Sequence, residues 1–239
     1  DVSRKVLSKG DLPDDPATSQ NFIRALHRAK DGTLWIASER GLSRYDPRTS
    51  TSKLYQVVPS TVYVRENNFG TVLEDPTGLI WAGHYWVPGF EVFDPQTEQF
   101  RRYDNSPNNP LSLSISNGVF SLYEDRSGVF WVGTWAGGLE KWDRKKRQFN
   151  TVEIDPDHVA LSVVLSIYED HAGRILLGTD NGLVHLNSRQ RKSSNYPYSR
   201  GKGIGKNQIT GIIDDPMERG VQWICSEDSG LIKFNFEKN

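Results

Sequence analysis

Residues able to bind a polar ligand gather in short loops that recur along the chain, each directly after an apolar stretch. Flat aromatic rings stand there beside acids, an arginine and an amide. This combination suits a sugar, because the rings cover its apolar faces and the polar groups bond its hydroxyls. We predict a binding site for an oligosaccharide or another small polar ligand, formed by Glu39, Arg40, His84, Tyr85, Trp86, Trp135, Asp180, Asn181, Glu227 and Asp228.

The sequence offers no motif for catalysis or for metal binding. None of the histidines pairs with another at ligand spacing, and Cys225 is the single cysteine. The chain also lacks a nucleophile elbow, a phosphate-binding loop and a dinucleotide fingerprint. We therefore predict no catalytic residue, no metal and no cofactor.

The charge balance argues against nucleic acid as a partner. The 239 residues carry a formal net charge of -1, which gives no general attraction to polyanions. The basic run 144–147 and the stretch 189–192 are expected to be solvated, with a patch for an acidic partner as the alternative. No apolar run is long enough for a membrane span, and residues 1–20 are polar, so we expect neither membrane insertion nor a signal peptide in this chain.

An internal repeat supplies the elements that position the loops. Each copy opens with an alternating apolar stretch, which has the period of a strand, and an acidic turn such as Glu124-Asp125-Arg126-Ser127-Gly128 follows. The Asp of this turn can accept backbone N–H bonds, so its recurrence favours hairpin capping over a metal site. Spacings of 45 to 50 residues separate five copies, which are centred on Trp35, Trp81, Trp131, Leu176 and Trp223.

Two further strands follow the Trp-bearing strand in each copy. A Gly-Leu pair, as in Gly138-Leu139, opens the third strand, and a weaker and more polar stretch such as Phe149 to Val152 forms the fourth. Four antiparallel strands every 45 to 50 residues are typical of a propeller blade. We predict an all-β propeller of five four-stranded repeats, a single domain over residues 1–239, either as a closed five-bladed ring or as part of a larger propeller. Arg4 to Leu7 could supply the strand missing from the last blade.

The repeats resemble those of the two-component regulator propeller family. Its pattern, an apolar opening followed by E-D-x-x-G-x-x-W-x-G-T and then G-L-x-x-x-D, is met almost completely by residues 124–143 and well by residues 169–187. The lead-in 108–114 resembles the linker between blades of that family. The first copy departs from the pattern, with Ala29 where the turn Asp belongs, and the fifth has a longer turn between Asp214 and Gly220.

This resemblance implies a periplasmic sensor region of a bacterial membrane-anchored regulator, whose neighbouring domains would be its partners. Members of the family sense oligosaccharides in some cases, which agrees with the chemistry of the loops. Two alternatives stay open. One is a propeller lyase or hydrolase acting on a polysaccharide, with acids of the loops converging beside His84; the other is a scaffold that buries its aromatic loops against a protein.

Overall fold

The computed structural model describes residues 22–59, 64–104, 113, 118–143, 148–152, 163–187, 192–196 and 208–236. The expected strand Arg4 to Leu7 and the basic run 144–147 lie outside these residues. The chain divides into two compact units, residues 1–102 and residues 103–239, and each is described by itself. Every sheet in both units is antiparallel and pairs strands that follow one another in sequence.

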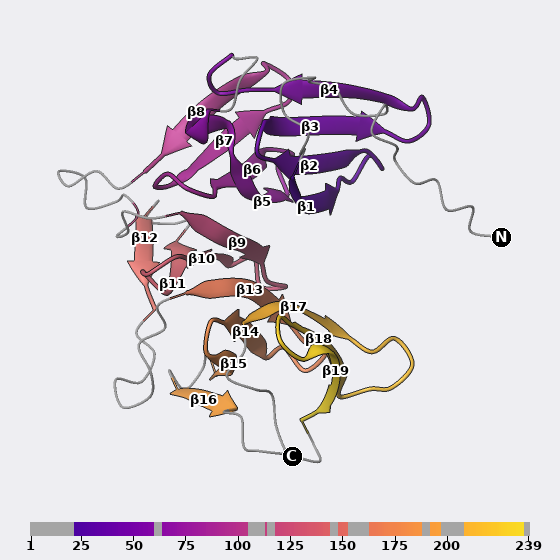
Figure 1. The fold of residues 1–239 in the computed structure, drawn as a ribbon, viewed down its shortest axis with the longest axis vertical. Coiled ribbons are helices and arrows are strands. Elements are labelled where there is room, and N and C mark those ends of the chain that lie inside the picture. The colour runs from indigo at the N-terminus through magenta and orange to yellow at the C-terminus, as the bar shows by residue number, and fades with distance from the viewer. Residues whose placement is uncertain are drawn as a thin grey trace. The chain divides into compact units, whose positions relative to one another are not determined.

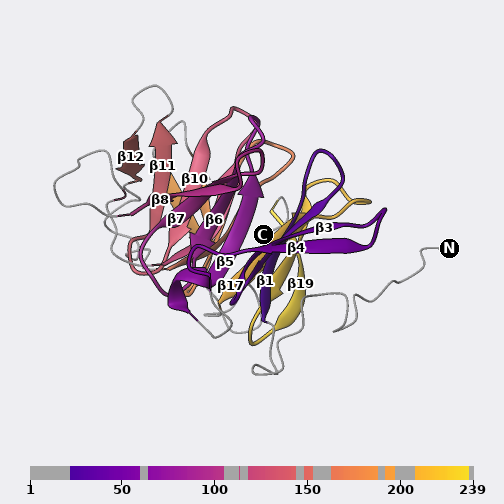
Figure 2. The ribbon, with the colours of Figure 1, turned by 90° about the horizontal axis from the view of Figure 1, so that it is seen from above.

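The first unit holds two four-stranded sheets (Figure 1). A 3-10 turn, Arg65–Asn67, precedes the second of them. The inner strands β1 and β5 of the two sheets lie side by side in both views (Figure 1, Figure 2). The strands are β1 (Ile23–Arg28), β2 (Leu34–Ser38), β3 (Gly41–Asp46), β4 (Thr51–Tyr55), β5 (Phe69–Glu74), β6 (Ile80–His84), β7 (Phe90–Asp94) and β8 (Gln99–Tyr103).

The second unit holds two four-stranded sheets and one three-stranded sheet. Its inner strands follow the same arrangement, with β9 beside β13 and β13 beside β17 (Figure 1). The strands are β9 (Val119–Glu124), β10 (Phe130–Thr134), β11 (Leu139–Asp143), β12 (Gln148–Thr151), β13 (Val164–Glu169), β14 (Ile175–Thr179), β15 (Gly182–Asn187), β16 (Lys192–Tyr196), β17 (Ile209–Asp214), β18 (Val221–Ser226) and β19 (Gly230–Asn235).

These sheets confirm the predicted fold class, an all-β propeller built from four-stranded antiparallel repeats. The second strand of each repeat is the core strand, and β6, β10 and β14 are buried along their whole length. The fourth strand is more exposed, as its polar sequence predicts. Trp35 of β2 packs edge-on against Phe93 of the next sheet, with ring centroids 5.7 Å apart, so the repeated Trp joins neighbouring blades.

Glycine in the core strand lets the next blade approach closely. A Cβ added to Gly178 of β14 would clash with Ser166 Oγ and with the backbone oxygen of Ile209 in β17. The Ser166 hydroxyl lies in this contact and donates to the Ile209 oxygen at 3.3 Å. Glycine is therefore needed at position 178 for the two blades to pack this closely.

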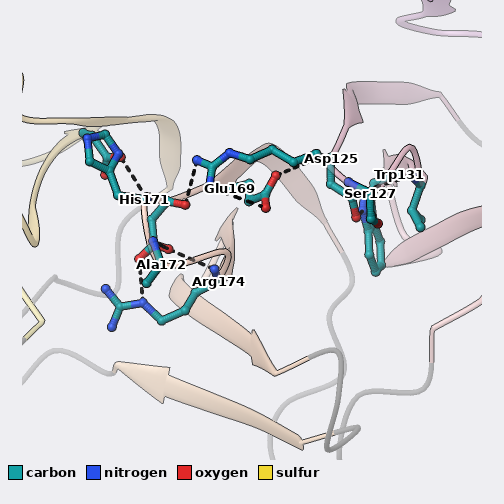
Figure 3. A network of polar contacts seen from close by, with 11 residues as sticks. Asp125, Ser127, Trp131, Glu169, His171, Ala172 and Arg174 are labelled. Carbon is teal, nitrogen blue, oxygen red and sulfur yellow. Dashed lines mark hydrogen bonds and ion pairs between the residues drawn. The ribbon is translucent and has the colours of Figure 1, made fainter.

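The turn Asp caps its hairpin as predicted (Figure 3). Asp125 Oδ1 accepts from the N–H groups of Ser127 and Val129 at 3.0 and 2.9 Å, and Asp125 Oδ2 accepts from Trp131 Nε1 at 2.8 Å. One carboxylate therefore fixes both the turn and the orientation of the core Trp. In the fourth repeat, where Leu176 replaces the Trp, the Nε–H of Arg174 donates to Asp170 instead (Figure 3).

In three repeats the acid before the capping Asp ties its turn to the turn of the preceding blade. Glu74 accepts from the backbone N–H of Lys30 at 2.8 Å, and Glu169 accepts from the backbone N–H of Arg126 at 2.8 Å. In the fifth repeat Asp214 takes this place and accepts from the N–H of His171 at 3.1 Å. A backbone donor and an acidic acceptor therefore connect consecutive blades within each unit.

Candidate functional site

Tyr85 and Trp86 form a rigid aromatic pair in the loop between β6 and β7. Their rings meet edge to face, with centroids 4.8 Å apart and planes at 89°. The backbone N–H of Tyr85 donates to the Asn68 carbonyl at 2.9 Å, which holds the loop against the start of β5. The Trp86 side chain is 60% exposed, so the pair presents a fixed ring to solvent.

Arg24 of β1 lies over the ring of Tyr85. Its guanidinium carbon stands 3.6 Å from the centroid of the Tyr85 ring, and its Nε–H donates to Asn68 Oδ1 at 3.2 Å. A cation at this distance from a ring face is held by the ring's quadrupole and fixes the ring in turn. Arg24, Tyr85 and Trp86 are named here the aromatic loop site.

Sequence reasoning missed Arg24, although the repeat carries a signal for it. Arg24 is the second residue of its inner strand, next to the β-bulge that shifts the register between Ile23 and Ala25. The other repeats place unrelated residue types at this position, and such variation within a constant frame marks a position that the fold leaves free for function. The corresponding residues are Gly70, Phe120, Leu165 and Thr210.

His84 lies in the core and not in the loop where the sequence analysis placed it. It is the last residue of β6 and is 0% exposed, stacked on Phe69 with centroids 5.0 Å apart. Its Nε2 lies 3.2 Å from Glu91 Oε1, and Arg102 NH1 donates to the same oxygen at 3.2 Å. The reason is the position of His84 at the end of the core strand, where the side chain points inward. In other repeats this position holds a hydroxyl residue such as Thr134, whose hydroxyl donates to the Gly138 carbonyl.

Burial has the largest effect on the pKa of His84, and it lowers that pKa. Glu91 opposes the decrease by hydrogen bonding, and the positive charge of Arg102 reinforces it. His84 is therefore neutral near pH 7, and its Nε2 lies 3.2 Å from both Glu91 Oε1 and Arg102 NH1. This group of three side chains fixes the base of the loop that carries Tyr85, since Arg102 NH2 also donates to the Pro88 carbonyl at 2.9 Å.

The other predicted residues of the first unit follow β2. Glu39 and Arg40 are half-buried, and the backbone N–H of Glu39 donates to the Phe22 carbonyl at 3.2 Å. The Arg40 N–H donates to Ser38 Oγ at 3.3 Å. This loop thus leaves from the end of the core strand, as the Tyr85 loop does in the next sheet.

In the second unit the predicted residues occupy the same kind of loop on three successive sheets. Trp135, which is 48% exposed, follows β10 and packs against Phe120 with ring centroids 5.4 Å apart and planes tilted by 35°. Asp180 and Asn181 follow β14 and are half-buried. Glu227 and Asp228 follow β18 and are exposed. All of them thus lie in loops between the second and third strands, as predicted.

A comparison with family descriptions decides what these repeats are. The description "Two component regulator propeller" matches residues 18–40 and 114–136, which run into the core strands of the first and third repeats. Two segments of the chain therefore match repeats of the two-component regulator propeller family. Both matched segments end at the loop after the second strand, at Arg40 and at Ala136.

Solved structures share the fold of this propeller chain. The extracellular domain assigned to a hybrid two component system of B. thetaiotaomicron aligns with a TM-score of 0.71 at 23% identity, over 91% of this chain and 29% of that one. Catalytically inactive virginiamycin B lyase from Staphylococcus aureus, solved with quinupristin, gives 0.68 at 10% identity, over 90% and 67%. PorZ of Porphyromonas gingivalis gives 0.63 at 12% identity, over 95% and 34%.

These similarities establish the propeller fold and no more. The chain spans 29% of the B. thetaiotaomicron protein's chain, well under two thirds. Comparison with curated protein sequences gave no match.

Two further observations concern the described part of this propeller. No helix there has the length and apolar character that a membrane crossing needs. No three His, Cys, Asp or Glu side chains gather there in a way that could hold a metal ion.

Proposed function

We propose that this chain is a non-catalytic, ligand-sensing propeller module of a bacterial signal-transduction regulator, and that it works in the periplasm. The family of its repeats supports this proposal, as does its fold similarity to an extracellular domain assigned to a hybrid two component system. The ligand is an oligosaccharide or another small polar molecule. The neighbouring domains of the receptor are its partners.

The observation that carries the proposal is the construction of the aromatic loop site. An exposed ring normally costs free energy in water and gains it when an apolar ligand face covers it. Trp86 is 60% exposed, yet it is braced by Tyr85, which Arg24 holds in turn at 3.6 Å. A ring that is already fixed loses little conformational entropy when a ligand stacks on it.

Polar groups around the rings provide the second half of sugar recognition. The guanidinium of Arg24 offers donors to ligand hydroxyls, and the loop after β2 brings acidic and basic side chains, Glu39 and Arg40, within the same unit. In the second unit, Trp135 with Asp180 and Glu227 supply the same chemistry on the corresponding loops. Hydroxyls both donate and accept, so acids, amides and arginine together suit them.

Signalling requires that the ligand bind one receptor state more tightly than another. A ligand with equal affinity for both states shifts no equilibrium, however tightly it binds. The propeller would therefore change its packing against neighbouring receptor domains when the aromatic loop site is occupied.

A thermal-shift screen against a panel of neutral oligosaccharides tests the proposal. A ligand that binds only folded protein raises the unfolding midpoint, by an amount that corresponds to about 2.7 kcal/mol at a hundredfold excess over Kd. We expect one or more panel members to raise the midpoint, and Trp86→Ala to reduce the affinity at least tenfold. Met217→Ala, at a side chain 92% exposed in a hairpin turn of the second unit, is the matched surface control and should retain the response.

Two other outcomes would contradict parts of this proposal. A well-folded protein that responds to no oligosaccharide would contradict glycan sensing and favour the aromatic loops as a protein-binding surface. Turnover of a polysaccharide, lost on Glu227→Gln or Asp228→Asn, would contradict the non-catalytic assignment and favour a lyase or hydrolase.

A further inference from the structure

The first hairpin turn departs from the hydrogen-bond pattern of the other Trp-bearing repeats. Three turns hold the indole N–H of their core Trp on the capping Asp: Trp81 on Asp75 at 3.0 Å, Trp131 on Asp125 at 2.8 Å and Trp223 on Asp215 at 2.9 Å. In the first repeat Ala29 occupies the Asp position, six residues before Trp35 as Asp75 is before Trp81. The carboxylate that the Trp35 indole would meet is therefore missing.

A second donor loses its acceptor through the same change. The capping Asp also accepts from the backbone N–H two residues later, as Asp75 does from Thr77 at 2.8 Å. In the first turn this donor is the N–H of Asp31. Among the described residues, neither the Asp31 N–H nor the Trp35 indole N–H has an acceptor. Two donors thus face the place where one carboxylate stands in the other turns.

A cavity of about 490 Å³ lies at this place. Ala29 and Trp35, which are 7% and 2% exposed, contribute to its wall, so the position of the missing carboxylate opens into it. The cavity is formed between the first two sheets, on the side of the hairpin turns, whereas the aromatic loop site lies where the core strands end. Its remaining lining comes from residues 30–31, 44, 74, 77–80 and 94–96.

The charges around the cavity are compatible with an added carboxylate. Its lining carries two cations, Lys30 and Arg44, and three acids, Asp31, Glu74 and Asp94. Asp31 pairs with Arg44, whose NH2 lies 2.7 Å from Asp31 Oδ2. Glu74 accepts from the backbone N–H of Lys30 at 2.8 Å, and Lys30 Nζ donates to the Asp75 carbonyl at 3.0 Å. The other repeats hold a carboxylate at this position directly after a second acid, so the repeat tolerates it there.

We propose that this cavity binds the carboxylate of a small ligand, which takes the place of the missing Asp side chain. One carboxylate oxygen accepts from the Asp31 N–H, and the other accepts from the Trp35 indole N–H. The two N–H donors, and not the charges of the lining, select a carboxylate, because its two oxygens can accept from both of them. The site is separate from the aromatic loop site and does not depend on the proposed sensing function.

The indole N–H resonances of a ¹⁵N-labelled chain report on this site directly. We expect one of them, assigned to Trp35 with a Trp35→Phe variant, to move downfield and to saturate as sodium acetate is added. Sodium chloride at equal ionic strength should leave it in place. Ala29→Asp, which restores the side chain of the other turns, should shift the same resonance without acetate, raise the unfolding midpoint and abolish the acetate response.

Ala29→Ser is the matched control, because its short hydroxyl leaves most of the cavity open and should retain at least part of the acetate response. Three results would overturn the proposal: no saturable shift with acetate, an equal shift with chloride, or an acetate response in Ala29→Asp as large as in the original chain. If Trp35→Phe does not fold, the resonance that Ala29→Asp displaces identifies Trp35.

Discussion

At the scale of single residues, His84 combines a titratable ring with complete burial. Its Nδ1 is buried and has no hydrogen-bond partner among the described residues, and its Nε2 lies against Glu91. Protonation would place a second N–H in a position without an acceptor, which costs free energy. The ring is therefore suited to packing at neutral pH and opposes folding when it is charged.

This burial predicts a pH dependence of stability. The pKa of His84 is lowered from 6.5 in the folded protein, so the unfolded chain binds a proton more readily as the pH falls. The contribution of neutral His84 to the free energy of unfolding is fully present above pH 6.5. It decreases as the pH falls below that value toward the pKa of His84 in the folded protein. We expect His84→Gln to show a smaller decrease of the unfolding midpoint between pH 7.5 and pH 5 than the original chain.

The comparison is differential, because burial also lowers the pKa of His27 and His185. Those two residues are present in both proteins and contribute equally to both slopes. Identical slopes for the variant and the original chain, measured by thermal unfolding in the same buffers, would contradict the assignment to His84.

At the scale of the element, the capping Asp is the residue that joins the turn to the core strand. Asp125 accepts from two backbone N–H groups and from Trp131, so its removal leaves three donors without their partner. We expect Asp125→Ala to reduce the free energy of unfolding by about 2 kcal/mol, measured by urea denaturation.

Asp46→Ala is the control for this substitution. Asp46 accepts from the backbone N–H of Arg48 at 2.9 Å and from the exposed Arg48 guanidinium, but it holds no core side chain, so its removal should cost less than that of Asp125. Equal losses in the two variants would show that the turn carboxylate has no special role.

The core strands make a second prediction, about blade spacing. Gly178→Ala places a methyl group against the backbone oxygen of Ile209, which cannot move without shifting β17. We expect a loss of about 1 to 3 kcal/mol in the same measurement. At Gly211 an added Cβ would meet its nearest atom, in Cys225, at an ordinary 3.5 Å, so Gly211→Ala should be close to neutral. A neutral Gly178→Ala would mean that neighbouring blades are not tightly packed.

At the scale of the whole molecule, the repeat made the sheets predictable from sequence. The alternation of the inner strand, the acidic turn and the Gly-Leu pair each depend on local chemistry, so copies centred on Trp35 and on Leu176 are recognisable in spite of their differences. The Asp–Trp hydrogen bond shows why the two residues recur together. The prediction of a single domain stays a prediction, since the two compact units are described separately.

The candidate sites were less predictable, because they depend on contacts between repeats. Tyr85 and Trp86 could be predicted as site residues because the sequence places them in a loop. Arg24 could not, because it reaches Tyr85 only through the packing of one sheet on the next. Loop membership also misplaced His84, whose strand ends one residue later than the turn residues indicated. Ala29 was visible as a departure from the pattern, whereas the cavity beside it follows from the space between two sheets.

The acid that ties one turn to the next has a consequence for how such chains change over evolutionary time. Glu74, Glu169 and Asp214 all accept from a backbone N–H, and the donating residues Lys30, Arg126 and His171 have unlike side chains. A duplicated or exchanged repeat therefore brings its own acceptor and finds a donor wherever the preceding turn has a residue other than proline at this position. The second and fifth turns have Pro76 and Pro216 there, so a repeat inserted directly after either of them would lack this contact.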